Sequence, residues 1–136
     1  MEFVVANWYL FAALALILFM LFGSTITLAM NGIKSVNASQ AIQLVNHDKG
    51  VMIDVCETVE YQQGHIPGAG NYPMSTLGAR LKDLEKHKAK PVIVVCRSGN
   101  RSARAAVMLK KQGFGQVYNL NGGNMAWQRD SLPMEK

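Results

Sequence analysis

The sequence predicts an α/β fold with a central parallel sheet, preceded by one N-terminal transmembrane helix. Two observations carry this prediction. Short apolar runs alternate with helical patterns from residue 33 onward, and residues 3–30 contain no charged side chain. Strands that alternate with helices indicate a parallel sheet covered on both faces. We therefore expect an anchor over 1–30, a linker with a first strand over 31–38, and a folded domain over 39–136.

The N-terminal apolar segment is long enough to cross a bilayer as a helix. Trp8 and Tyr9 near its start match the aromatic residues that favour a membrane interface. A cleavable signal peptide is the alternative, but it requires a positively charged start, and the charges here are the amino terminus and Glu2. The segment is also longer than the apolar core of a signal peptide. The prediction is therefore a single-pass anchor.

Charge predicts the side of the membrane on which the domain lies. All 14 lysines and arginines lie at or after Lys34. The positive-inside rule then places the domain in the cytoplasm. Two cysteines are too few for a disulfide scaffold and indicate reduced thiols, which fits the same compartment. No basic run is interleaved with aromatic residues, so nucleic acid is not an expected partner.

The elements of the domain follow from apolar periodicity and from turn residues. Ser39 is a suitable N-cap for a helix, Gly64 and Gly113 end two others, and the Gly- and Pro-rich stretch 65–73 indicates a loop. Buried strands are predicted where apolar runs of about five residues occur. The expected strands are 33–36, 51–55, 71–72, 91–95 and 116–120. The expected helices are 40–47, 57–63, 76–87, 101–112 and 124–130.

A candidate active site lies where two buried strands end. Asp54 and Cys96 occupy such ends, and open α/β sheets place their sites there. After Cys96 comes a loop that opens a helix, so backbone N–H groups and the helix N-terminus surround the sulfur with partial positive charge. Such surroundings favour the thiolate, which is the nucleophile. The loop residues that are candidates to bind a substrate are Arg97, Ser98, Gly99, Asn100, Arg101 and Ser102.

A plain buried cysteine before a capped helix is the alternative interpretation of this stretch. Against it, two arginines, a glycine and two hydroxyl side chains lie within seven residues of the thiol. These are the features that define the setting of a reactive cysteine. No Cys/His spacing suggests a metal site, and no cofactor is expected.

Three motifs in order carry a family resemblance. "CRSGNRS" resembles the active-site loop of rhodanese-type sulfurtransferases, "MIDVCETVEYQQGHIPGAGNYP" resembles their Asp-Val-Arg to Gly-His-Ile-Pro-Gly-Ala block, and "GFGQVYNLNGGNMAW" resembles their closing pattern. The resemblance covers about residues 33–133. It implies a three-layer rhodanese-like fold around a parallel sheet. The whole chain resembles the single-domain, membrane-anchored rhodanese-like proteins of bacteria, which implies the bacterial inner membrane.

The resemblance also implies a chemistry. Cys96 would accept sulfane sulfur from thiosulfate or a persulfide and pass it to cyanide, a thiol or a protein, in a ping-pong reaction. The amides of residues 97–102 would hold the persulfide, while Arg97 and Arg101 would bind the anionic donor. The Cys-x4-Arg loop is one residue shorter than the Cys-x5-Arg loop of the related phosphatases, which favours sulfur over phosphate.

One departure from the family leaves alternatives open. Cys56 stands where the family has the arginine of Asp-Val-Arg, which leaves the pairing of Asp54 and Glu60 open. Cys56 is either a resolving thiol for Cys96 or a small buried residue without chemistry. Asp54, Glu60 and His65 are expected to support the fold rather than to move protons. The alternative function is a rhodanese-fold interaction module that contacts other membrane proteins, with weak or no catalysis.

Overall fold

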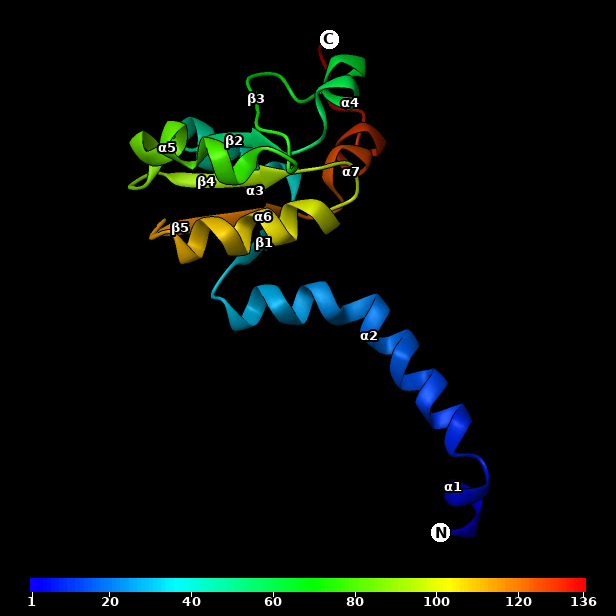
Figure 1. The fold of residues 1–136 in the computed structure, drawn as a ribbon. Coiled ribbons are helices and arrows are strands. Elements are labelled where there is room, and N and C mark those ends of the chain that lie inside the picture. The colour runs from blue at the N-terminus through cyan, green and yellow to red at the C-terminus, as the bar shows by residue number, and fades with distance from the viewer.

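A five-stranded parallel sheet forms the centre of the molecule (Figure 1). The computed structural model describes the backbone of residues 1–136 and the side chains of all but residues 24–27. The strand order is β1-β5-β4-β2-β3, and every neighbouring pair is parallel. The predicted α/β fold with a parallel sheet is confirmed. The strands are β1 (Lys34–Val36), β2 (Val51–Asp54), β3 (Gly70–Asn71), β4 (Pro91–Val95) and β5 (Gln116–Leu120).

Helices cover both faces of this sheet. One core contains side chains from α5 and α6 together with Val92 and Val94 of β4. The other contains side chains from α3 and α7 together with Ile93 and Val95. All five residues of β4 are buried, which explains its continuous apolar sequence. The helices are α1 (Glu2–Ala6), α2 (Trp8–Met30), α3 (Ala38–His47), α4 (Thr58–Gln63), α5 (Leu81–Leu84), α6 (Asn100–Lys111) and α7 (Gly123–Arg129).

Two helices differ from the sequence prediction. The helix expected over 76–87 is instead a 3₁₀ turn (Leu77–Arg80), the short α5 and a second 3₁₀ turn (Glu85–His87). This path buries Leu77 and Leu84 completely, and Gly78 in the first turn disfavours a regular α-helix. Helix α3 begins two residues earlier than expected, because Asn37 rather than Ser39 provides the cap and forms a capping box with Gln40.

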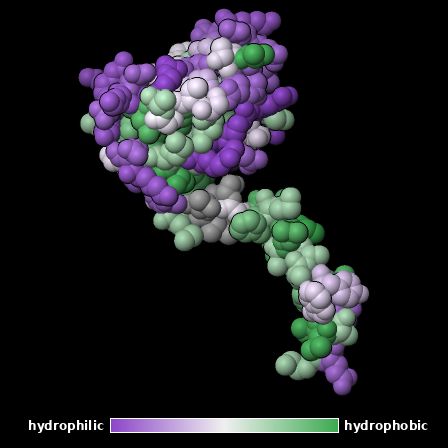
Figure 2. Space-filling view, viewed as in Figure 1, coloured by the Kyte–Doolittle hydropathy of each residue, from purple (hydrophilic) through white to green (hydrophobic). Residues whose placement is uncertain are grey.

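The expected transmembrane helix over 3–30 is not supported. The helical path is interrupted at Asn7, between α1 and α2, and Leu28 near the end of α2 is buried in the core formed with α6. The expected span includes residues 24–27, whose side chains are outside the described part of the structure. Among the residues that the structure describes, no helix is both long and apolar enough to cross a membrane. Helix α1 and the first part of α2 project away from the domain, and their apolar side chains lie on the surface (Figures 1 and 2).

Candidate active site

Cys96 lies directly after β4, at the end of the sheet where β2 also ends. Its neighbour Val95 pairs with Asp54 in the parallel register, so Asp54 and Cys96 reach the same edge, as the sequence predicts. The Cys96 side chain is buried. The Gly99 amide donates a hydrogen bond to its Sγ over 2.9 Å, and the thiol itself donates to the Ser102 hydroxyl over 3.4 Å. The loop therefore folds back over the sulfur and offers it a backbone donor.

Gly99 makes this loop possible. It has φ +110°, in the region that favours glycine, and it is the N-cap of α6. Of the predicted residues, Arg97 and Ser98 are exposed on the loop and Asn100 is exposed at the start of α6, whereas Ser102 is buried. The sulfur consequently lies at the N-terminus of a 12-residue helix, where the helix dipole stabilises negative charge.

Next to the sulfur, the predicted residue Ser102 pairs with a buried residue that the sequence analysis missed, Asn119. The Ser102 Oγ lies 3.0 Å from the Gly99 carbonyl oxygen and 2.5 Å from Asn119 Oδ1, so its single proton is shared between two acceptors. Asn119 comes from the carboxyl end of β5, which neighbours β4. Open α/β sheets place active-site residues at the carboxyl ends of their strands. The same rule, applied to β5, identifies Asn119 as a candidate.

Helix α7 packs directly on the peptide of the nucleophile. Gly123 has φ +57°, and a Cβ there would lie 2.1 Å from the Cys96 carbonyl oxygen, so only glycine fits. The Asn124 amide donates to that oxygen over 2.8 Å, and the Met125 amide donates to the Arg97 carbonyl over 3.0 Å. The second glycine of the "NGG" turn thus fixes α7 against the active-site loop.

Arg101 is bound to Glu60 of α4. Its Nη1 and Nη2 donate to the two carboxylate oxygens over 2.6 and 2.8 Å, a bidentate pair. The pair lowers the pKa of Glu60 from 4.5 to about 2 and raises the pKa of Arg101 above its ordinary value. Because Cys56 replaces the family arginine, the sequence leaves the partner of Glu60 open. In the structure, that partner is Arg101.

Asp54 and Cys56 lie next to this pair. Asp54 is fully buried, and its carboxylate accepts from the Cys56 amide over 2.9 Å and from Asn124 Nδ2 over 3.3 Å. It therefore joins the end of β2 to α7. Burial, reinforced by the Asp54 charge, raises the pKa of the Cys56 thiol from 9.0 to about 12. Cys56 is a neutral thiol at pH 7, and its Sγ lies 3.9 Å from Arg101 Nη2.

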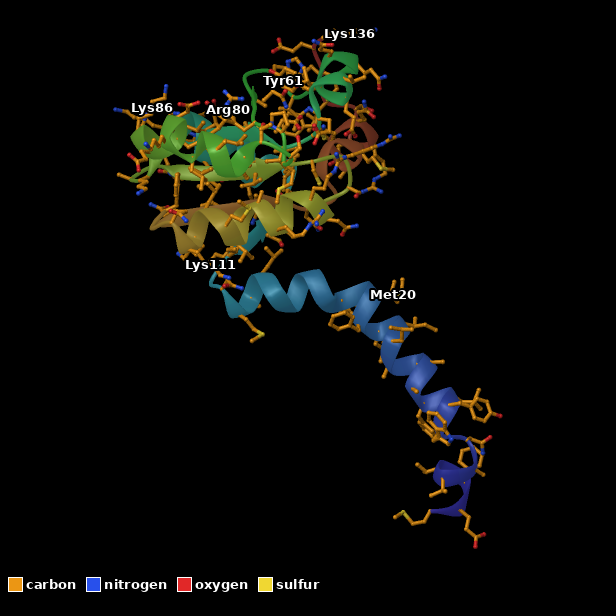
Figure 3. The ribbon with its side chains drawn as sticks, viewed as in Figure 1. Met20, Tyr61, Arg80, Lys86, Lys111 and Lys136 are labelled. Atoms are coloured by element: carbon orange, nitrogen blue, oxygen red, sulfur yellow. The ribbon has the colours of Figure 1, made fainter. Side chains whose placement is uncertain are left out.

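His65 holds the C-terminal segment. Its ring stacks on Tyr61 with centroids 3.7 Å apart, its Nδ1 lies 2.9 Å from the Tyr61 carbonyl oxygen, and its Nε2 lies 3.2 Å from a carboxylate oxygen of Glu135. Figure 3 shows Tyr61 and Lys136, the last residue, at the same end of the molecule. These contacts give His65 the supporting position that the sequence suggests. Across residues 1–23 and 28–136, no three His, Cys, Asp or Glu side chains are grouped to hold a metal ion.

Comparison with known proteins agrees with this geometry. The family model described as Rhodanese-like domain matches residues 37–130. A "Sulfurtransferase" of Allochromatium vinosum is 37% identical and aligns with 77% of this chain and 94% of its own. "Thiosulfate sulfurtransferase GlpE" of Pseudoalteromonas translucida is 34% identical over 70% of this chain and 89% of its own. The crystal structure of a rhodanese-related protein from Thermoplasma volcanium has a TM-score of 0.67 and 30% identity, covering 75% of this chain and 97% of that one.

Proposed function

We propose that this chain, which belongs to the rhodanese-like domain family, is a sulfurtransferase that carries sulfane sulfur as a persulfide on Cys96. The observation that carries the proposal is the position of the Cys96 sulfur. It lies 2.9 Å from the Gly99 amide at the start of α6, and a backbone donor at a helix N-terminus stabilises a thiolate or a persulfide anion. The relatives named as sulfurtransferases support the same reaction class.

The reaction has two steps that need no cofactor. In the first, the Cys96 thiolate attacks the outer sulfur of thiosulfate, a new S–S bond forms, and sulfite leaves with the electron pair of the broken bond. In the second, the thiolate of an acceptor attacks the outer sulfur of the persulfide. The S–S bond to Cys96 breaks and its electron pair returns to the Cys96 sulfur. The covalent intermediate makes this ping-pong catalysis.

The two arginines of the loop have different roles in this proposal. Arg97 is exposed and binds the anionic donor as it approaches the sulfur. Arg101 instead joins α6 to α4 through Glu60. It therefore attracts the anionic donor through its positive charge and makes no direct contact with it. The donor itself remains thiosulfate or a persulfide, since both present an outer sulfur and an anionic leaving group.

The persulfide is tested by intact mass. The full chain in a mild detergent is incubated with thiosulfate, desalted and measured, and we expect a gain of about 32 Da, the mass of one sulfur atom. The Cys96→Ser variant should show no gain, while the matched Cys56→Ser variant should gain as wild type does. If the wild-type chain gains no sulfur from thiosulfate or from a persulfide donor, the proposed sulfurtransferase activity is refuted. The alternative, a rhodanese-fold interaction module, then becomes the better interpretation.

We also propose that the N-terminal arm, residues 3–22, attaches the domain to the cytoplasmic face of a bacterial inner membrane. Its apolar side chains are exposed, with Trp8, Phe19 and Leu21 each more than half exposed, and exposed apolar surface of this extent requires a lipid or protein partner. Replacing Trp8, Phe19 and Leu21 with serine should release the chain from washed membranes. A C-terminal tag accessible from outside intact spheroplasts would refute the cytoplasmic placement.

A further inference from the structure

We infer that one basic surface of the domain binds the headgroups of anionic phospholipids, as a second membrane contact beside the apolar arm. This surface, called here the α2-side surface, consists of Lys34 at the start of β1 and of three residues of α6: Arg104, Lys110 and Lys111. The inference rests on the attachment of the arm proposed above, and it names the class of lipid that the chain recognises.

The α2-side surface surrounds the place where the arm joins the domain. Leu28, near the end of α2, is buried in the same core as Ala106 of α6. Gly32 follows the end of α2, and a Cβ at this glycine would lie 3.9 Å from Cε of Lys110. Figure 1 shows α6 alongside the last turns of α2. A membrane that holds the arm therefore lies on the α6 side of the domain.

The charged side chains of α6 flank the contact with α2. Arg104 and Lys111 are seven residues apart, which is about two helical turns, so they lie on the same face of α6. Both are exposed, and Val107 between them packs against the core that contains Leu28. Lys34 is also exposed and lies four residues after the end of α2. Figure 3 shows Lys111 beside this end of α2.

The positive charge of this surface is not neutralised by nearby carboxylates. Residues 91–129, which contain β4, α6, β5 and α7, include six lysines and arginines and no aspartate or glutamate. Among the residues that the structure describes, no salt bridge joins the α2-side surface to a carboxylate. Lys110 donates to the Gly115 carbonyl oxygen over 3.0 Å and keeps its charge in this contact. The surface thus presents four positive charges to a partner.

The neighbouring apolar side chains identify a bilayer as this partner. Phe19 and Leu21 of α2 are 71% and 64% exposed, and Met30, its last residue, is 82% exposed. A dissolved polyanion would pair with the lysines and leave these apolar side chains in water. An anionic bilayer covers both, because its acyl region takes up apolar side chains and its phosphates attract the basic residues beside them.

The test measures binding of the full chain to lipid vesicles by flotation. The vesicles are phosphatidylcholine, which is neutral, or an equal mixture with phosphatidylglycerol, which is anionic. The arm variant, Trp8→Ser with Phe19→Ser and Leu21→Ser, is used so that strong apolar insertion does not hide the effect of charge. We expect this variant to bind anionic vesicles at least about 100-fold more tightly than neutral ones, and high salt to remove the difference.

Two sets of substitutions in the arm variant assign the preference to its residues. The basic-surface variant replaces three exposed residues of the α2-side surface: Lys34→Gln, Arg104→Gln and Lys111→Gln. It should bind anionic vesicles about 100-fold more weakly, which is about fivefold for each lost charge. The control variant removes the same charge from three exposed lysines outside this surface: Lys82→Gln, Lys86→Gln and Lys90→Gln. Figure 3 shows Lys86 on the part of the domain away from α2, so this affinity should change by less than about twofold.

The outcomes separate the α2-side surface from the arm. If the wild-type chain binds neutral vesicles no better than the arm variant, the attachment of the arm is refuted, whereas an anionic preference that only the basic-surface variant loses still supports the surface. Equal binding of the arm variant to both kinds of vesicle overturns the inference, as does an equal loss in the basic-surface and control variants. Retention on heparin without a preference for anionic vesicles would also overturn it, since the surface would then bind a different polyanion.

Discussion

Replacing Glu60 with glutamine is expected to destabilise the domain at neutral pH and to do so less in acid. Both Glu60 oxygens accept from Arg101, at 2.6 and 2.8 Å, and one of them also accepts from the Glu57 amide over 3.3 Å within the cap of α4. Glutamine keeps the size of the side chain and one acceptor oxygen, but it loses the charge. The substitution therefore tests the ion pair with little change in packing.

The pKa of Glu60 sets the magnitude and the sign. A fall of the pKa from 4.5 to about 2 corresponds to at most about 3 kcal/mol of stability. A third of the Glu60 side chain and 28% of the Arg101 side chain are exposed, so screening by water reduces this to about 1–2 kcal/mol. Because the folded pKa is the lower one, the stabilisation is complete above about pH 4.5 and is lost as the pH falls towards 2.

Urea unfolding of the full chain in a mild detergent, followed by circular dichroism, measures this effect. The difference in unfolding free energy between wild type and Glu60→Gln should be about 1–2 kcal/mol at pH 7 and should shrink between pH 4.5 and pH 2. Glu85→Gln is the matched control, since the Glu85 pair with Lys88 is exposed and 3.8 Å long and should change stability by less than about 0.5 kcal/mol. A difference for Glu60→Gln that is no larger than this control, or that does not vary with pH, would refute the reasoning.

Two further predictions concern the cysteines and the packing of α7. Gly123→Ala should destabilise the chain by more than about 2 kcal/mol in the same urea assay, because its Cβ would clash with the Cys96 carbonyl oxygen, whereas Gly78→Ala, with open space at its Cβ, should be neutral or stabilising. In the Cys96→Ser background, iodoacetamide should modify native Cys56 hardly at all at pH 7, since this thiol is buried with a pKa of about 12. Rapid modification of Cys56 at pH 7, seen by mass, would contradict that environment.

Much of the domain was predictable because its signals are local. The apolar run of β4 and the turn glycines predict the strands and most helices within a few residues. The position of Cys96 beside Asp54 also follows, since parallel strands end at one edge of a sheet. The broken segment 77–87 was not predictable from periodicity, because its leucines are spaced as in a helix and only tertiary burial of Leu77 and Leu84 decides its path.

Local sequence patterns do not predict which side chains pair with one another within the site. Glu60 and Arg101 lie 41 residues apart in sequence, and Asp54 and Asn124 lie 70 apart. Each residue alone looks like an ordinary member of a helix or a turn, so the pairing emerges only when the sheet brings α4, α6 and α7 to the same edge. The resemblance implies that Arg101 contacts the donor, but it does not show that the Glu60 carboxylate occupies this guanidinium.

The cysteine at position 56 is best understood together with Arg101. The family arginine at that position would place a second cation beside Glu60, but here Arg101 satisfies both carboxylate oxygens and Cys56 contributes a neutral thiol. With Cys56 at this position, the Glu60–Arg101 pair is formed in full, and Cys96 keeps its helix terminus and its backbone donor.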